Sequence, residues 1–563
     1  MLLLKNGMND TGTKRSGFFS NAFYVGVAMA ILTFLLIFVV YPILRVFLSS
    51  LWIDQNLDFS HFMRLFSGRR IILLRNTLIV STLSTIFATF TGLLLSIFVN
   101  RSHWPGRKFV HYAAILNMIS PPFVSAIVYI MLFGRRGLIT SQLLGLDLNL
   151  FGPGLIILLQ TIGNGSIAYL IISNVLRNLD TTLEDSAMDL GAAKHQVFFS
   201  VTFPLLLPGL TASASLIFAN VLSDFGTPIL VGAGYRVLAS EAYLQLISNF
   251  NLGYASAISV VLLFLSVWIY AAEKLILRNK AFTAREPVAF QKIETRRSMF
   301  SSPIMLLLFI IAATYASLVF LQFLTIMTGA FTSVWGYDFS FSLRHFASAR
   351  IQAFKSLQNS LTFAYQVAIF GPLLGLTTAY LHSKLRGSVK EWVHAIALSP
   401  YVIPGTVMGI SYVMAFHHPP LQLTGTAAVI VLVCMVRELP ISFSSTKALL
   451  RQLSSHLEDA SRDLGANRRQ TFTKVIAPSL MPAYRLGMLH AFIHVMITIG
   501  AIIFLITPRH VTLTFEIFSA VNLGQMGLGA AYAFVLIVFT VLGLISLNLL
   551  WVFFSWLQRR RND

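Results

Sequence analysis

Charged residues and cysteines are both scarce in this chain of 563 residues. Asp, Glu, Lys and Arg together make up 11% of the sequence, whereas soluble domains usually carry about 25%. The single cysteine, Cys434, excludes a disulfide framework and a metal site built from several cysteines. Hydrophobic residues make up 56% of the chain, and 47 residues are phenylalanine. The shortage of charge therefore indicates that much of the surface faces lipid instead of water.

Nucleotide-binding and secretory signals are missing as well. The chain has no G-x-x-x-x-G-K-[ST] phosphate-binding loop, and Gly134-Arg135-Arg136-Gly137 does not match that pattern. The apolar run from about Phe23 to Phe47 is longer than the core of a signal peptide and has no small-residue cleavage site, so we expect a membrane span there. The net charge of +20 comes from basic residues in short loops between apolar runs. Membrane topology explains this charge better than a nucleic-acid partner, and we expect none.

Apolar runs of membrane-spanning length recur along the whole chain. A bilayer core requires about 20 apolar residues per helix, and about twelve runs qualify. Only helices and closed barrels satisfy their backbone groups in lipid, and the short alternating segments of barrel strands are absent. The sequence therefore predicts an all-α polytopic membrane protein. The expected spans lie near residues 22–48, 76–99, 111–133, 154–175, 207–231, 255–276, 303–328, 358–381, 393–416, 426–446, 484–506 and 529–556.

Lysine and arginine residues predict the orientation of these spans, because they concentrate in cytoplasmic loops. With a cytoplasmic N-terminus and twelve spans, the inside segments hold about 26 basic residues and the outside loops about 11. We therefore expect both termini in the cytoplasm of a bacterial cell, with the chain in the inner membrane. A charged linker over residues 277–302 is expected to join two halves, 1–276 and 303–563.

The two halves repeat one another. Each contains the same number of expected spans, so the repeats should be parallel and related by a pseudo-two-fold axis along the membrane normal. Asn76-Thr77-Leu78 matches Asn359-Ser360-Leu361 (359 − 76 = 283), and the strongest match, Leu183–Ala192 with Leu457–Ala466, has a shorter offset (465 − 191 = 274). Further matched pairs are Gly92 with Gly375, Arg101 with Lys384, and Ser120-Pro121 with Ser399-Pro400.

The strongest match lies in two loops, 176–206 and 447–480, each between the fourth and fifth span of its half. Each loop predicts a short helix, 183–190 and 457–464. Thr181-x-x-Glu184 and Ser455-x-x-Glu458 are capping-box patterns, and Gly191 and Gly465 are helix stops. One such loop would suit a generic amphipathic helix, but two copies at the same place argue for a shared role. Prolines follow both loops at the same spacing, Pro204 and Pro208 in the first and Pro478 and Pro482 in the second.

These residues resemble the conserved loop of ABC importer permeases. That pattern reads Glu-Ala-Ala, three residues, Gly, nine residues, then an aliphatic residue, any residue, Leu and Pro. Here Asp185-Ser186-Ala187 and Asp459-Ala460-Ser461 take the first three places, while Phe203 and Ala477 replace the leucine. The resemblance implies the type I permease fold, with two pseudo-two-fold-related halves of six helices.

The resemblance also implies how the protein is powered. Each loop would form a coupling helix in a cleft on an ATPase subunit, and its carboxylates would pair with basic groups there. The expected partners are two copies of an ABC ATPase, an extracytoplasmic substrate-binding protein and membrane lipid. ATP and magnesium would be bound by the ATPases, so this chain would carry no cofactor and would not be an enzyme. The implied coupling residues are Glu184, Asp185, Ala187, Gly191, Pro204, Glu458, Asp459, Ala460, Gly465 and Pro478.

Polar residues within the expected spans are candidates for a translocation path, because ionisable groups are costly in a membrane. Asn220 and Asp224 share one helix face, as do His490 and His494. The alternative interpretation is hydrogen bonding between helices. Two histidines four residues apart can also ligate a metal, but we do not predict a metal site. The candidate path residues are Asn117, Gln160, Asn164, Asn220, Asp224, Arg437, Glu438, His490 and His494.

The fused two-half length resembles that of ferric-iron permeases and, in the same group, thiamine and 2-aminoethylphosphonate permeases. Ser223–Leu230, Val237–Ala239, Glu241–Tyr243 and Pro121–Val124 are most similar to the ferric-iron type, so we expect ferric iron as substrate. A secondary transporter of the major-facilitator type is the alternative from another class. Two matched docking loops argue against it, since such a transporter has no ATPase to dock.

Overall fold

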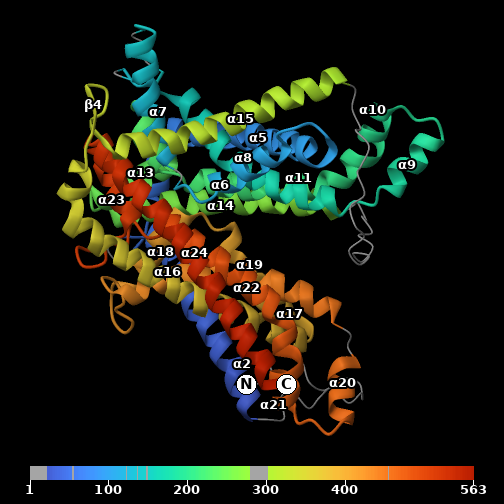
Figure 1. Ribbon diagram of the computed structural model, residues 1–563. Helices are drawn as coiled ribbons and strands as arrows, with labels where there is room; N and C mark the ends of the chain where they lie inside the picture. Colours follow the sequence, from blue (N-terminus) through green and yellow to red (C-terminus); the bar gives the residue numbers. More distant parts are fainter. Residues whose placement is uncertain are drawn as a thin grey trace.

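The computed structural model describes residues 22–53, 56–121, 123–135, 137–146, 150–278, 302–453 and 456–562. This part of the chain is almost entirely helical (Figure 1). It contains 11 helices long and apolar enough to cross a membrane, or up to 12 if a bent pair of helices counts as one span. The prediction of an all-α polytopic protein is confirmed. Most of the expected linker lies outside the described residues.

The first half consists of long apolar helices with short helices between them. The helix α5 runs over 31 residues with only Arg75 and Arg101 as charged residues, which explains why it forms a continuous span. The elements are α2 (Ala22–Leu35), η2 (Leu36–Val40), α3 (Tyr41–Leu51), β1 (Trp52–Ile53), β2 (Asn56–Leu57), α4 (Ser60–Phe66), η3 (Gly68–Arg70), α5 (Ile71–Arg101), α6 (Arg107–Asn117), α7 (Val124–Phe133), η4 (Leu138–Leu143), α8 (Pro153–Arg177), α9 (Thr182–Asp189), α10 (Lys194–Val197), η5 (Phe198–Thr202), α11 (Phe203–Ser223), α12 (Gly226–Val231), α13 (Leu238–Ile247) and α14 (Leu252–Arg278).

From α16 onward the second half repeats the order of helices that begins at α5 in the first half, without counterparts of η4 and α12. The antiparallel hairpin β3–β4 joins its first two long helices, as β1–β2 lies between α3 and α4 in the first half. The elements are α15 (Ser302–Ala330), β3 (Thr332–Val334), β4 (Asp338–Phe341), α16 (Arg344–Lys384), α17 (Gly387–Val402), α18 (Gly405–Phe416), α19 (Ala427–Gln452), α20 (His456–Asp463), α21 (Arg468–Thr471), η6 (Phe472–Ile476), α22 (Ala477–Ile497), α23 (Leu513–Asn522) and α24 (Met526–Asn562).

The residues that repeat in the sequence have the same structural roles in both halves. A Cβ added to Gly92 would lie 2.3 Å from Ala168, and one added to Gly375 would lie 2.3 Å from Ser442, so each glycine allows two long helices to cross closely. The hydroxyl of Thr77 accepts a hydrogen bond from the backbone N–H of Leu238 at 2.8 Å. Ser360 accepts the equivalent bond from Leu513 at 2.9 Å. The repeat therefore encodes helix crossings and caps.

The first helix of each half packs against the opposite half. Helix α15 lies on α5, α6 and α7 (Figure 1), where the Tyr315 hydroxyl lies 2.6 Å from Ser166 Oγ and donates to the Ile162 carbonyl at 3.1 Å. In the other direction α3 packs on α18, and Tyr412 donates to the carbonyl of Phe38 at 2.6 Å. Because buried polar groups have no water partners in lipid, these bonds fix the exchanged helices in place.

Four of the expected spans are broken or end earlier than predicted. Residues 111–133 form two helices, α6 and α7, around Pro121, and residues 393–416 form α17 and α18, which are bent by 113° at Ile403 and Pro404. Proline lacks the N–H that a continuous helix needs, which explains both breaks. The span expected at 207–231 ends with α11 at Ser223, and that at 484–506 ends with α22 at Ile497. The short tenth run, by contrast, is part of a full helix, α19.

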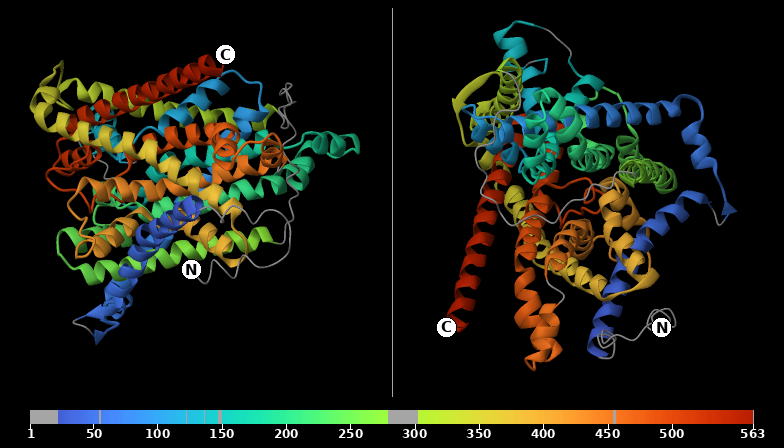
Figure 2. Two further views of the ribbon diagram at one scale, coloured as in Figure 1. Left: turned by 90° about the horizontal axis from the view of Figure 1, so that it is seen from below. Right: turned by 90° about the vertical axis from the view of Figure 1, so that its right-hand side faces the viewer.

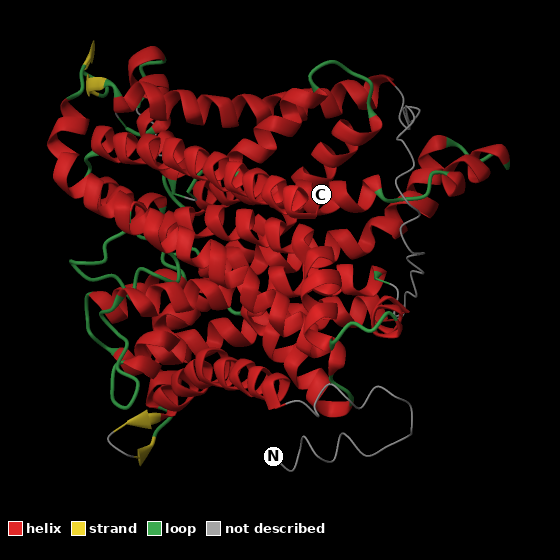
Figure 3. Cartoon of the chain, turned by 60° about the horizontal axis from the view of Figure 1, so that its bottom comes forward, coloured by secondary structure: helices red, strands yellow, loops and turns green. Residues whose placement is uncertain are grey.

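The two hairpins lie at one end of the molecule (Figures 2 and 3), and the loop helices α9 and α20 lie at the other (Figure 1). We call the end that carries α9 and α20 the loop end. The long helices α5 and α16 finish at this end, beside the loop helices. Both copies of the matched loop therefore reach the same face of the protein.

Candidate functional site

Helices α9 and α20 agree within one residue with the predicted segments 183–190 and 457–464. Gly191 and Gly465 follow them with φ of +88° and +82°, a left-handed conformation that favours glycine. The backbone N–H of Ala192 donates to the Ala187 carbonyl at 3.1 Å, and Ala466 donates to Ser461 at the same distance. Both helices end in the same type of turn, so the predicted helix stops are confirmed.

The capping box predicted for the first loop is wrong. Thr181 makes no side-chain capping bond. Instead Asp180 Oδ1 accepts hydrogen bonds from the backbone N–H of Thr182 at 3.0 Å and from its hydroxyl at 2.8 Å. Glu184 turns away from the helix start to a partner on another helix. In the second loop Ser455 lies outside the described residues, and Glu458 also bonds elsewhere.

A buried ion pair ties α9 to the end of α5. Arg101 Nη1 and Nη2 donate to the two carboxylate oxygens of Glu184 at 2.7 and 2.6 Å, and the side chains are only 4% and 6% exposed. Thr202, in the turn before α11, donates to the same carboxylate at 2.9 Å. Glu184 is therefore bonded within this chain, and its pairing with a basic group on an ATPase stays a prediction.

The second loop has the equivalent ion pair in a more exposed setting. Lys384 Nζ lies 2.5 and 2.6 Å from the carboxylate oxygens of Glu458, and both side chains are 22% exposed. Glu458 is thus also bonded within this chain, and its pairing with an ATPase likewise stays a prediction. The repeat already matched Arg101 with Lys384 and Glu184 with Glu458, but these pairs lie more than 70 residues apart in the sequence. Only the fold shows that the matched residues bind one another.

The outward faces of both loop helices carry leucine and aspartate. Leu190 is 90% exposed and Leu464 is 88% exposed, each directly before the helix-stop glycine. Asp185 and Asp459 are exposed as well. The two leucines were not among the predicted coupling residues, although an apolar residue at the same place in both copies was a usable signal. The same apolar residue is therefore exposed at the same place in both copies of the loop.

The remaining predicted coupling residues lie beside these faces. Ala187 is half-buried, whereas Ala460 is exposed. Pro204 and Pro478 occupy the first turns of α11 and α22, where a helix needs no N–H from them. The prolines therefore begin the helices that follow the loops and are not part of the loop helices themselves.

A polar cluster lies within the long helices of the second half. Glu438 on α19 is 2% exposed, and its two carboxylate oxygens lie 2.8 Å from His490 Nδ1 and 2.5 Å from His494 Nδ1. The two histidines on α22 are 36% and 32% exposed, and their rings stack. The neighbouring Arg437 donates to Thr498 at 3.0 Å. The structure thus brings together four of the predicted path residues, with the imidazoles on the accessible side of a buried carboxylate.

No metal site accompanies this cluster. The described part of the chain contains no group of three or more His, Cys, Asp or Glu side chains arranged to hold a metal ion.

In the first half, the predicted path residues form hydrogen bonds at the break between α11 and α12. Gln160 accepts from Ser84 at 2.8 Å and donates to Asp224 Oδ2 at 2.9 Å. Asp224 Oδ1 accepts the backbone N–H of Thr227 at 3.0 Å and thereby caps α12. Asn164 donates to the Gln160 carbonyl at 2.9 Å. These bonds account for the early end of α11.

The last two candidate path residues, Asn117 and Asn220, differ in burial. Asn117 is 5% exposed and donates to Ser166 at 3.0 Å and to the Ile162 carbonyl at 3.1 Å, so its amide joins α6 to α8. The structure thus supports the alternative interpretation, hydrogen bonding between helices, for this residue. Asn220 lies on α11 and is half-buried.

Comparison with known proteins identifies the class of protein that this fold and these loops represent. The family model of the binding-protein-dependent transport system inner membrane component matches twice, at residues 88–280 and 371–558. The chain belongs to this family of inner-membrane permeases. Its two matches correspond to two permease units fused in one chain, and they decide against a secondary transporter.

Individual relatives show which permeases of this family the chain is similar to. The chain is 28% identical to the ferric transport system permease protein FbpB of Actinobacillus pleuropneumoniae, over 95% of this chain and 78% of the relative. It is also 28% identical to the putative ferric transport system permease protein FbpB 1 of Haemophilus influenzae, over 86% of this chain and 78% of the relative. A putative 2-aminoethylphosphonate permease, PhnV of Salmonella typhimurium, is 27% identical over 41% of this chain and 88% of its own length.

Proposed function

We propose that this chain is the membrane-spanning permease of an ATP-driven importer for ferric iron. The assignment of ferric iron as the substrate rests on similarity, over nearly the whole chain, to permeases named for ferric transport. The similarity to the 2-aminoethylphosphonate permease covers less than half of the chain, which makes that substrate the second candidate. Ferric iron is cargo here, and a binding protein would deliver it to the permease.

The loop helices support docking to two ATPase subunits, one at α9 and one at α20. Each helix presents an exposed leucine and an exposed aspartate, and each is anchored by its own ion pair. ATP and magnesium would be bound by those subunits. The loop end would then face the cytoplasm, together with both termini, as the distribution of basic residues predicts.

The contacts of α9 suggest how ATPase movement reaches the membrane. A bidentate ion pair is directional, so a shift of α9 pulls on Arg101 at the end of α5. The bond from Thr202 passes the same shift to the turn that precedes α11. Lys384 joins α20 to α16 in the same manner. Because packed helices move as rigid elements, a displacement at the loop end reaches the full length of α5 and α16.

The polar cluster of the second half is the proposed lining of the translocation path. His490 and His494 keep about a third of their side-chain surface accessible although they lie within the helix bundle, and Glu438 beneath them is buried. A carboxylate shared by two imidazoles offers oxygen and nitrogen groups that interact weakly with a passing cation. Asn164 and Asn220, the positions equivalent to Glu438 and His494, would line the path from the first half.

Docking is tested by substituting the two helix-stop glycines. Gly191→Val and Gly465→Val force a β-branched residue into a left-handed conformation, with no heavy atom within 4 Å of the new Cβ. We expect insertion into the membrane to be normal and ATP-dependent uptake to be lost. Gly524→Val is the matched control, because that glycine has φ of +76° and equally open surroundings but lies between α23 and α24. Normal uptake in both loop variants would refute the docking role.

The substrate is tested separately from the docking. The binding protein that associates with this permease is purified, and its retained ligand is identified by mass spectrometry and metal analysis. Ferric iron supports the proposal, and a retained aminoalkylphosphonate replaces it with the second candidate.

A further inference from the structure

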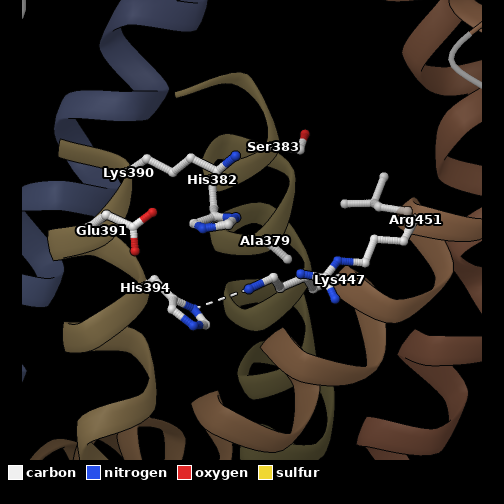
Figure 4. Close-up of a pocket in the computed structure, with 9 residues that line it drawn as sticks. Ala379, His382, Ser383, Lys390, Glu391, His394, Lys447 and Arg451 are labelled. Atoms are coloured by element: carbon white, nitrogen blue, oxygen red, sulfur yellow. Dashed lines mark hydrogen bonds between the residues drawn. The ribbon is translucent and has the colours of Figure 1, made fainter. Parts of the chain in front are cut away.

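A cavity of about 460 Å³ lies at the loop end of the second half (Figure 4). It is formed by the last turns of α16, the first turns of α17 and the last turns of α19. Basic side chains from all three helices converge on it, and one carboxylate lies at its edge. The basic residues are His382, Lys390, His394, Lys447 and Arg451, and the carboxylate is that of Glu391.

The positive charge of this basic cavity is only partly compensated. Lys390, Lys447 and Arg451 have no carboxylate oxygen within 4.0 Å in the part of the chain that the structure describes. Like charges held together at the membrane surface repel one another. Glu391 balances at most one of the three cations. An anion inside the cavity would remove this repulsion.

A histidine at the cavity wall adds a hydrogen-bonding group to the charged side chains. His382 is only 5% exposed, and no described residue is hydrogen-bonded to its imidazole. Its ring packs 5.4 Å from the rings of both His394 and Phe443. The dashed line in Figure 4 marks the contact of 3.4 Å between Lys447 Nζ and His394 Nδ1. The ring nitrogens of His382 are not buried atoms, so they are free to bond to a ligand in the cavity.

The equivalent region of the first half is closed by hydrogen bonds. Asn100 donates to Ser173 at 2.7 Å and accepts from Arg177 Nε at 2.8 Å, and His111 lies 2.6 Å from the Tyr169 hydroxyl. At the offset of 274 residues Ser173 corresponds to Lys447 and Tyr169 to Phe443, which offers no hydroxyl to a histidine. The fold itself therefore does not require an open basic cavity, and this feature is specific to the second half.

We propose that the basic cavity binds a phosphate group. Ammonium, guanidinium and imidazole donors around one small volume are the groups that bind phosphate oxygens most strongly. Basic pockets between membrane helices on the cytoplasmic side bind the headgroups of anionic phospholipids. Trp392, beside this cavity on α17, is 69% exposed, and exposed tryptophans mark the membrane–water interface. A position at the membrane–water interface favours a phospholipid headgroup over free phosphate as the source of the bound phosphate group. The assignment of the cavity to the cytoplasmic leaflet rests on the proposed orientation of the chain. The binding of a phosphate group does not depend on that orientation.

The test measures binding without relying on transport. The full-length permease, with the subunits that accompany it, is reconstituted into nanodiscs of phosphatidylcholine with or without phosphatidylglycerol. Retained phosphatidylglycerol is counted by native mass spectrometry. Lys447→Gln combined with Arg451→Gln should weaken retention by about 25-fold, since each basic group near the surface contributes about fivefold. Arg177→Gln, the equivalent arginine of the first half, removes a cation at the same depth and should leave retention unchanged.

Inorganic phosphate distinguishes the two sources. If discs without phosphatidylglycerol bind labelled phosphate, and the double variant does not, the ligand is free phosphate. The single variant Lys390→Gln, with an expected loss of about fivefold, provides the result if the double variant fails to fold. Equal phosphatidylglycerol retention in wild type and the Lys390 and double variants, without phosphate binding, would overturn the proposal. Equal loss in the Arg177 control would also overturn it, because binding would then be non-specific.

Discussion

The ion pair between Arg101 and Glu184 is the principal anchor of helix α9. Glu184 is the one residue of this eight-residue helix that is buried. Replacing it with glutamine leaves the Arg101 guanidinium, 4% exposed, without a counter-charge. Removing one partner of a buried pair costs about 3–5 kcal/mol. We therefore expect Glu184→Gln to increase local opening of α9 by about 150- to 5,000-fold.

Hydrogen–deuterium exchange with mass spectrometry measures this opening helix by helix. Peptides covering α9 should exchange much faster in Glu184→Gln, whereas peptides covering α20 in the same molecule should not change. Glu458→Gln provides the graded comparison. Its pair is 22% exposed on both sides, so solvent weakens it and the expected cost is about 1 kcal/mol, or about fivefold.

A double variant separates the charge from the packing. Arg101→Met with Glu184→Met removes both charges and keeps most of the volume, and such replacements are often nearly neutral. Exchange in α9 should return close to that of the wild type, apart from the bond that Thr202 loses. Unchanged exchange in Glu184→Gln, or a double variant as open as the single one, would refute the anchoring role.

Three further predictions concern docking, the polar cluster and the helix crossings. Leu190→Asp and Leu464→Asp should leave the fold intact and reduce co-purification of an ATPase by about 10- to 150-fold each, because a leucine buried at an interface contributes about 1.5–3 kcal/mol. Glu438→Gln should reduce uptake by at least about tenfold without loss of membrane insertion, since buried intramembrane charges are functional by default. Gly92→Val and Gly375→Val should abolish monodisperse protein on size-exclusion chromatography, because each Cβ would lie 2.3 Å from the adjacent helix.

Each of these predictions has an outcome that would contradict it, and the glycine variants also have a matched control. Gly163→Val, on α8, adds a Cβ with no heavy atom within 4 Å and should elute normally. If it is lost as well, the crossings are not the reason. Wild-type ATPase recovery in both leucine variants would contradict the docking face. Full uptake with Glu438→Gln would remove the carboxylate from the path.

The correspondence between sequence and fold was strongest where one side chain has one local consequence. Gly191 and Gly465 marked their helix ends within one residue, because the left-handed turn depends on glycine alone. The capping box at Thr181 failed for the opposite reason. Its glutamate had two possible partners, a nearby backbone N–H and a distant guanidinium, and the buried guanidinium bonds it in the fold.

Breaks within the spans also depend partly on local residues and partly on distant partners. Prolines at 121 and 404 were visible in the sequence, but whether such a residue only kinks a helix or divides it depends on what bonds the freed backbone. The end of α11 at Ser223 contains no proline, and Asp224 produces it by capping α12 while Gln160 holds the second oxygen. A local sequence pattern does not predict a hydrogen bond to a side chain on another helix.

The sequence by itself determined that this protein is a fused pair of helical membrane units with two matched loops, because hydropathy and repetition are properties of the chain order. Only the tertiary structure decided what the matched residues do. It paired Arg101 with Glu184 and Lys384 with Glu458, and it exposed Leu190 and Leu464. Ion pairs and exposed faces depend on which helix ends meet, and helices far apart in the sequence meet only after the two halves have packed against each other.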